Sequence, residues 1–363
     1  MSSDREAIRV EFLKAAGLER AERHPLPGDA STRRYERLVL PDDSTLMLMD
    51  APPSAESRPC PPAASRGERI ALGYNAMARL AAGRVDAFAA AARFLRERGL
   101  GAPEIVALDA EQGLAVTEDL GDGLFARLIE TGADERELYF AAIEALARLH
   151  AEPAPDALPV GDGAWPLLAY DDLALKTGAD LFVDWYPQFD PRVRLDEAAK
   201  AEWDRLWAPW RARAEAGASV FIHRDYHAEN LLWLPERDGH ARVGMIDFQD
   251  ALRGHPSWDL HSLLQDARRD VSPEIEAAAL DRYFALRPEV DREAFLDDYA
   301  ALAALNEARI LGIFARLIVR DGKPRYQAFM PRMWAHLGRN LARPELTGLK
   351  AWFDRHVPAE VRQ

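Results

Sequence analysis

The sequence has a single cysteine, Cys60, and no apolar run near the ~18 residues that a membrane-spanning helix requires. One cysteine excludes an intramolecular disulfide and a zinc site built on cysteine ligands. The first residues, MSSDREAIRVEF, are charged and follow a helical pattern, so they lack the apolar stretch of a secretory signal peptide. We therefore expect a cytoplasmic protein with no membrane partner.

Positively charged residues are in the minority. The 363 residues include 46 Lys and Arg against 60 Asp and Glu, which gives a net charge of −14. Such a surface repels a phosphate backbone, so we expect no nucleic-acid partner. Apolar residues make up 48% and charged residues 29%, which is typical of a folded globular protein with two or three compact units at this length.

The first 117 residues have the pattern of a small sheet with flanking helices. A stretch with five prolines at 51–65 excludes a helix or a central strand there. The expected elements are, in chain order, a helix over 4–16, two strands between Leu26 and Met49 with a turn at 41–43, a helix over 85–98, and a hairpin with strands at 104–109 and 114–119.

After Gly121-Asp122-Gly123 the pattern becomes mostly helical. Two strand-like runs, around 218–225 and 242–250, interrupt the expected helices, which cover 137–151, 196–216, 274–318 and 326–342. The fold class is therefore α+β. We expect a β-rich N-terminal lobe at 1–117, a hinge at 118–122 and a helical C-terminal lobe at 123–363.

Two polar motifs each follow a short apolar run. Residues 223–230 read HRDYHAEN, and residues 247–250 read DFQD. We expect Asp225, Asn230 and Asp247 to leave adjacent strand ends. One carboxylate and one amide oxygen suit Mg²⁺ held against nucleotide phosphates, and a second carboxylate suits proton transfer from an attacking hydroxyl. The spacing H-R-D-x-x-x-x-N is that of the protein-kinase catalytic loop.

These motifs, HRDYHAENLL and VGMIDFQDA, resemble the aminoglycoside phosphotransferase and choline kinase family, which has a protein-kinase-like fold of two lobes. The segments MDAPP, TEDLGD, HRDYHAENLLWLP, IDFQDA and GIFARLIVRDGKPRY are similar, more narrowly, to bacterial kinases that phosphorylate the anomeric hydroxyl of N-acetylmuramate and N-acetylglucosamine in cell-wall recycling. The resemblance implies a kinase that uses ATP and Mg²⁺ and takes an amino sugar as its small-molecule substrate.

The resemblance also implies roles for the motif residues. Asp225 would be the catalytic base, and Asn230 and Asp247 would be the magnesium ligands. His223 would mainly brace the catalytic loop. Asp259, in GHPSWDL, is expected to tie that loop down from the start of a helix.

The nucleotide-binding residues implied by the resemblance lie in the N-terminal lobe. The loop at 28–33, with Ser31, Thr32 and Arg33, would cover the phosphates, while the Glu118 carbonyl and the Leu120 amide would meet the adenine edge. Related enzymes place a lysine against the phosphates. Here no lysine lies between Lys14 and Lys176, so Arg33 and Arg34 are the candidates for its role.

Candidate substrate residues lie in the C-terminal lobe. His227 would orient Asp225 or the substrate, or else brace the loop. Trp185 and Tyr186 would stack on a sugar face, or else belong to the core.

Three further polar residues are candidates for the same site. Asn306 and Arg309 share one face of a mostly apolar helix, where each needs a polar partner that is either a sugar hydroxyl or a protein group. Arg325 lies in the basic segment 320–325, which is either a solvated loop or part of the substrate cleft. Arg309 and Arg325 are the two candidates for a cation that meets the lactyl carboxylate of muramate.

Several alternatives remain open at this stage. The acceptor could be another alcohol, such as choline, an aminoglycoside or homoserine. The missing lysine leaves room for a nucleotide-binding pseudokinase. His223, Asp225 and His227 could instead form a zinc cluster for hydrolysis, although Asn230 and Asp247 would then have no role.

Overall fold

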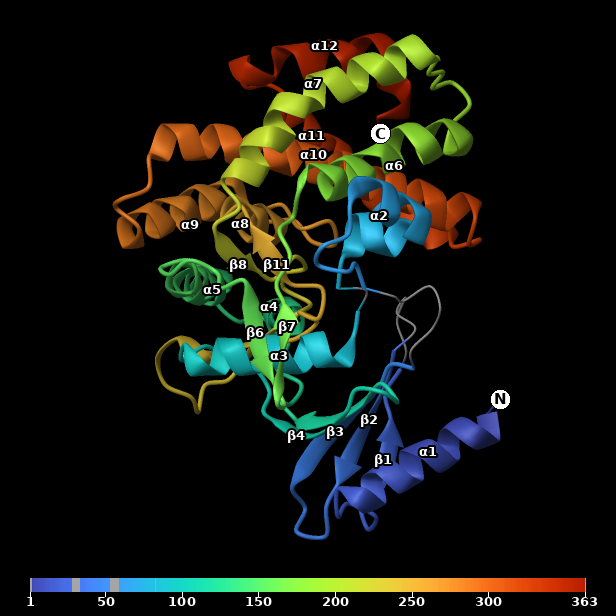
Figure 1. Cartoon of the computed structure of the whole chain (residues 1–363). Helices are drawn as coiled ribbons and strands as arrows, with labels where there is room; N and C mark the ends of the chain where they lie inside the picture. Colours follow the sequence, from blue (N-terminus) through green and yellow to red (C-terminus); the bar gives the residue numbers. More distant parts are fainter. Residues whose placement is uncertain (1, 28–32, 53–58, 82, 363) are drawn as a thin grey trace. The chain divides into compact units, whose positions relative to one another are not determined.

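The computed structural model describes the chain at residues 2–27, 33–52, 59–81 and 83–362 (Figure 1). Ser31 and Thr32, from the expected phosphate-covering loop, lie outside the described residues, whereas Arg33 lies within them. Contacts divide the chain into two compact units. Unit 1 comprises Met1–Ala145, Pro155–Leu168 and Ala228–Ala251, and unit 2 comprises Leu146–Ala154, Ala169–His227 and Leu252–Gln363. The expected boundary between two lobes, at 118–122, does not coincide with the boundaries of these two units, so the division into lobes stays a prediction.

The main feature of unit 1 is a five-stranded antiparallel sheet in the order β1-β2-β3-β5-β4 (Figure 1). Its strands are β1 (Glu22–Pro25), β2 (Arg34–Val39), β3 (Thr45–Asp50), β4 (Ile105–Asp109) and β5 (Leu114–Glu118). Helix α1 (Ser2–Ala15) covers the sheet, where Leu13 joins a core cluster with Leu38, Leu48 and Val116. The sequence missed β1, because ERHP is polar and ends in proline. A proline is tolerated there because β1 pairs on one side only.

Helices and two small hairpins complete unit 1. They are α2 (Arg66–Leu72), a π-helical turn (Asn75–Arg79), α3 (Val85–Glu97), α4 (Phe125–Glu130), the hairpin of β6 (Ala157–Val160) and β7 (Gly163–Pro166), and the pair β9 (Leu231–Trp233) and β10 (Val243–Met245). The helix expected at 85–98 and the hairpin expected at 104–119 are confirmed. The π-helical turn and the β6–β7 hairpin were not predicted.

Unit 2 is mostly helical and holds one small strand pair. Helix α5 (Glu135–Leu149) passes from unit 1 into unit 2, and the rest are α6 (Asp172–Phe189), α7 (Glu197–Ala216), β8 (Val220–Ile222), β11 (Leu252–Gly254), α8 (Ser257–Leu264), α9 (Pro273–Leu286), α10 (Arg292–Val319), α11 (Met330–Asn340) and α12 (Thr347–His356). The helical stretch expected over 274–318 consists of two helices, α9 and α10, because Pro288 interrupts the backbone hydrogen bonding between them. None of the described helices is both long and apolar enough to cross a membrane.

Helices α6 and α10 pack closely in unit 2. A Cβ added to Gly312 of α10 would come within 2.5 Å of the Leu181 carbonyl oxygen of α6. The missing side chain therefore lets the two backbones touch. This contact sets the position of the polar residues that α10 carries.

Candidate active site

The first motif begins where β8 ends, in unit 2. Strand β8 is buried and pairs with β11, with Ile222 opposite Leu252. The backbone N–H groups of His223 and Arg224 then donate to the Asp259 carboxylate, at 2.6 and 2.9 Å. Asp259 therefore holds the loop from the first turn of α8, as the sequence predicted.

The backbone of this loop adopts an unusual conformation at Arg224. Arg224 has a φ of 77°, in the left-handed region that non-glycine residues rarely adopt. Burial raises the pKa of Asp259 to about 7, while the two N–H donors favour its charged form and the charge of Asp225 opposes it. Strained backbone and a perturbed buried carboxyl are typical of functional loops.

Asp225 lines a cavity of about 160 Å³ in unit 2. His227, Asn306 and Arg309, which the sequence singled out, line the same cavity. The sequence missed the segment that follows α8, which contributes Gln265, Asp266 and Arg268. The signal for them is the charged stretch QDARRD directly after an apolar helix, but a solvated loop gives the same pattern.

Two hydrogen bonds order the polar groups of this cavity. The Arg268 Nη1 lies 3.1 Å from His227 Nε2. Because a guanidinium can only donate, that ring nitrogen of His227 accepts and carries no proton. On α10, Arg309 Nη1 donates to Asn306 Oδ1 at 2.9 Å, and Asn306 is 7% exposed. The cavity thus brings together a carboxylate, a neutral imidazole, an amide and cations.

The remaining substrate candidates lie elsewhere in unit 2. Tyr186 is 1% exposed, stacks on Phe182, and bonds through its hydroxyl to Trp334 and to the Val361 carbonyl. Of the two roles expected for Tyr186, the role in the core is confirmed and stacking on a sugar is wrong, because its ring and its hydroxyl both bind core residues. Trp185 is half-buried and does not line the cavity. Arg325 is exposed, lies over the Tyr326 ring at 5.2 Å, and also lies outside the lining.

The metal-ligand candidates lie in unit 1, at the ends of β9 and β10. These strands are antiparallel, with Leu231 opposite Met245, and the Ile246 N–H donates to the Asn230 carbonyl at 3.1 Å. Asn230 therefore stands opposite the residue that precedes Asp247. The expectation that the two apolar runs form adjacent strands is wrong, since β8 pairs with β11 and β10 pairs with β9.

Asp247 is held by two donors on one oxygen. Its Oδ1 accepts from Arg33 Nη2 at 2.5 Å and from Gln249 Nε2 at 3.1 Å. Asp247 has a φ of 67°, so the second motif also contains a non-glycine residue in the left-handed region. The neighbouring Phe248 is buried and stacks on Phe88 of α3.

Of the two arginines expected near the phosphates, Arg33 is the one that bonds to Asp247 of the second motif in the described part of the chain. Burial disfavours its charge, but Tyr35, Asp247 and Asp250 together raise its pKa, so it stays a cation. Arg34 is exposed at the start of β2.

Asp250 fixes the segment around the π-helical turn. Its carboxylate accepts from the Gly83 N–H at 2.7 Å and from Arg79 at 2.6 Å. Leu80, directly after the π-helical turn, has a φ of 61°. The sequence offered no signal for this contact, because its members are 167 and 171 residues apart.

The donor set of Asn230 and Asp247 fits Mg²⁺. Both side chains offer hard oxygen atoms, and the carboxylate already attracts a cation in the form of Arg33. The alternative zinc cluster of His223, Asp225 and His227 is not formed, since no three His, Cys, Asp or Glu side chains converge as a metal site within the described part of the chain.

The expected hinge follows β5 in unit 1. The Glu118 carboxylate pairs with Arg237, and its backbone carbonyl accepts from the Thr117 hydroxyl at 3.1 Å. Arg37 bonds to Asp119 at 2.6 Å and anchors the segment that contains Leu120. Contact of Glu118 and Leu120 with adenine stays a prediction.

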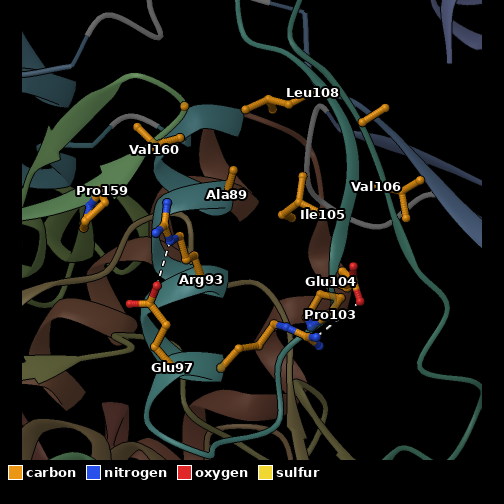
Figure 2. A pocket seen from close by; sticks show the side chains of 13 residues that line it. Ala89, Arg93, Glu97, Pro103, Glu104, Ile105, Val106, Leu108, Pro159 and Val160 are labelled. Atoms are coloured by element: carbon orange, nitrogen blue, oxygen red, sulfur yellow. Dashed lines mark hydrogen bonds and ion pairs between the residues drawn. The ribbon is translucent and has the colours of Figure 1, made fainter.

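A larger cavity of about 470 Å³ lies in unit 1, between α3, β4 and residues 159–161 (Figure 2). Figure 2 shows Ile105 on β4 and, on α3, Arg93 paired with Glu97. Arg96 of α3 pairs with Glu104 at 3.3 Å. None of the sequence-predicted site residues lines this cavity. The charged residues that line it pair with each other, so its chemistry differs from that of the cavity at Asp225.

The similarity to known proteins extends over most of the chain. The sequence pattern of the phosphotransferase enzyme family matches residues 22–305. Over 363 residues, the chain is 61% identical to an N-acetylmuramate/N-acetylglucosamine kinase of Caulobacter vibrioides, covering 100% of this chain and 99% of the relative. It is 32% identical over 338 residues to a protein of the same name from Pseudomonas aeruginosa, covering 91% and 87%.

The fold is similar to that of a solved phosphotransferase. The GDP complex of wild-type aminoglycoside 2′-phosphotransferase-IIIa matches with a TM-score of 0.53 at 13% identity, covering 92% of this chain and 99% of that one. The expected α+β fold of the protein-kinase type is confirmed.

Proposed function

Because this chain belongs to the phosphotransferase enzyme family, we propose that it is a kinase that uses ATP and Mg²⁺ to phosphorylate the anomeric hydroxyl of N-acetylmuramate and N-acetylglucosamine. The observation that carries this proposal is the cavity that places Asp225 beside groups able to bind a sugar. The names of the two relatives supply the substrate class. The reaction consumes ATP, and we expect it to take place in the cytoplasm as a step in cell-wall recycling.

Asp225 is proposed to accept the proton of the acceptor hydroxyl. As the hydroxyl oxygen bonds to the γ-phosphorus of ATP, the bond to the leaving phosphate oxygen breaks, and the hydroxyl proton passes to the Asp225 carboxylate. The anomeric hydroxyl is more acidic than the other sugar hydroxyls, so a carboxylate base suffices. The bonds from His223 and Arg224 to Asp259 support the proposal, because they hold the loop and hence Asp225 in place.

We propose that residues of unit 1 bind the nucleotide and its metal ion. Asn230 and Asp247 would hold Mg²⁺, which offsets the negative charge of the phosphates. Arg33 would take the place of the missing lysine, and its bond to Asp247 supports this role. Ser31 and Thr32 would cover the phosphates, and the backbone of Glu118 and Leu120 would bind adenine.

The acceptor is proposed to bind through His227, Asn306 and Arg309, which line the cavity with Asp225. Sugars need several hydrogen-bonding groups in fixed positions, and the amide and imidazole here are ordered by their own bonds. Trp185 and Arg325 stay outside the lining, so a role for them requires contacts beyond this cavity.

Phosphorus NMR of the product tests the proposal. The enzyme would be given ATP, Mg²⁺ and N-acetylglucosamine, and a phosphorus signal coupled to the anomeric proton is expected. Phosphate on the 6-hydroxyl would contradict the anomeric assignment, and turnover of choline, homoserine or an aminoglycoside instead would identify another alcohol kinase. Binding of ATP without turnover of any alcohol would indicate a pseudokinase.

A further inference from the structure

Arg309 differs from the other cations of the cavity in its partners. Arg224 lies over the Tyr170 ring at 4.8 Å, and Arg268 bonds to His227. Arg309 bonds to the neutral amide of Asn306, and no carboxylate among the described residues pairs with it. A half-buried guanidinium without a counter-ion favours an anion in the adjoining cavity.

The position of Arg309 is fixed by helix packing. A Cβ on Gly178 of α6 would lie 3.1 Å from Arg309 Cδ, so the glycine leaves room for the aliphatic stem. One turn further along α10, Gly312 lets the two helix backbones touch. Asn306, one turn earlier, accepts from Nη1. The guanidinium is thus held from both sides and reaches the cavity with little side-chain freedom left to lose.

From these observations we infer that Arg309 binds a carboxylate of the acceptor and selects acidic amino sugars over neutral ones. The inference rests on the proposed function, because it assigns the acceptor to the cavity at Asp225. N-acetylmuramate carries a lactyl carboxylate that N-acetylglucosamine lacks, and a planar guanidinium binds a carboxylate through two parallel hydrogen bonds. Arg325, the other candidate, is exposed and does not line the cavity.

Three acceptors and four variants test this. The acceptors are N-acetylmuramate, its methyl ester and N-acetylglucosamine, and the variants are Arg309→Ala, Arg309→Lys, Arg325→Ala and Arg205→Ala. Arg205 lies on α7 with a side chain that is 72% exposed, and it does not line the cavity. Arg309→Ala is expected to lower kcat/KM for N-acetylmuramate, chiefly through KM, by about 10- to 100-fold more than it lowers kcat/KM for the ester and the neutral sugar.

The controls separate charge recognition from a structural effect. Arg309→Lys keeps the charge but loses the planar fork, so it is expected to recover part of the preference for the acid over the ester. Arg205→Ala is expected to match the wild type. Equal losses for all three acceptors would overturn the inference, and so would a selective loss in Arg325→Ala. If Arg309→Ala does not fold, an unchanged preference in Arg309→Lys would overturn it instead.

Failure of the proposed function gives a different result. If the wild type phosphorylates neither sugar, the proposed function is wrong, and calorimetric titration then decides the role of Arg309. Binding of N-acetylmuramate to the wild type but not to Arg309→Ala would support the inference. Equal binding to both proteins, or binding to neither, would overturn it.

Discussion

Asp225 is the residue on which the proposed proton transfer depends. Asp225→Asn removes the charge and the basicity while keeping the size of the side chain. We expect phosphoryl transfer to fall by ~10²–10⁴-fold, the usual contribution of a general base, while ATP binding is retained. Turnover assays and calorimetric titration of ATP measure the two quantities. Wild-type turnover in this variant would show that another group takes the proton.

Arg33 and Arg34 are adjacent in sequence but differ in their surroundings. Arg33 is half-buried and bonds to Asp247, whereas Arg34 is exposed. We expect Arg33→Ala to weaken ATP binding and to leave the binding of adenosine unchanged, because only ATP carries the phosphates. Both affinities are measured by titration of the purified variants.

The neighbouring arginine provides the comparison for that prediction. Arg34→Ala removes the same charge from a surface position. A loss of ATP affinity in Arg34→Ala but not in Arg33→Ala would assign the phosphate contact to Arg34. No loss in either variant would mean that backbone amides and Mg²⁺ hold the phosphates without an arginine.

At the scale of elements, the contact of α6 with α10 positions the cavity residues. Gly312→Ala places a Cβ against the Leu181 backbone, which has no flexible end that could move away. We expect the free energy of unfolding to fall by about 1–3 kcal/mol, as for other overpacked cores. Turnover of N-acetylmuramate should fall as well, because Arg309 lies on the displaced helix. Denaturant unfolding measures the change in stability, and the KM for N-acetylmuramate measures the effect on substrate binding.

Gly338 provides a matched control on another helix. It lies in α11, is exposed, and has nothing within 4 Å of an added Cβ. Gly338→Ala is expected to raise the free energy of unfolding by up to about 1 kcal/mol, since alanine favours a helix more than glycine does. Equal changes in the free energy of unfolding for Gly312→Ala and Gly338→Ala would contradict the close packing of α6 and α10.

For the whole molecule, nucleotide binding should appear as stability of the folded state. A ligand that binds only the folded chain at 100 times its dissociation constant raises the free energy of unfolding by about 2.7 kcal/mol. We expect ATP with Mg²⁺ to raise the melting temperature of the wild type more than ATP alone does. In Asp247→Ala this magnesium-dependent difference should vanish.

Each protein is compared with itself, so a change of basal stability in the variant does not affect the result. Asp281→Ala, which changes an exposed aspartate on α9, is the control and should keep the difference. A magnesium-dependent rise that persists in Asp247→Ala would remove this residue from the metal site.

The sequence by itself determined the local elements and the order of the chemical motifs. Apolar periodicity located α1, α3, α5 and α7, because a helix that buries one face must repeat its apolar residues every three to four positions. The strand-like runs around 218–225 and 242–250, which contain β8 and β10, were found as short continuous apolar stretches between polar segments. Asp225, Asn230 and Asp247 were identifiable because their motifs are contiguous and their spacing is characteristic of kinases.

Only the tertiary structure decided which residues meet across long stretches of chain. It paired β8 with β11 and β10 with β9, placed Arg33 on Asp247, and buried Tyr186 in the core. It also brought the segment after α8 into the cavity with α10. Periodicity shows which face of an element is buried but does not show what that face packs against. The surroundings of Arg309 depend on two glycines in different helices, Gly178 and Gly312, and no local pattern connects them.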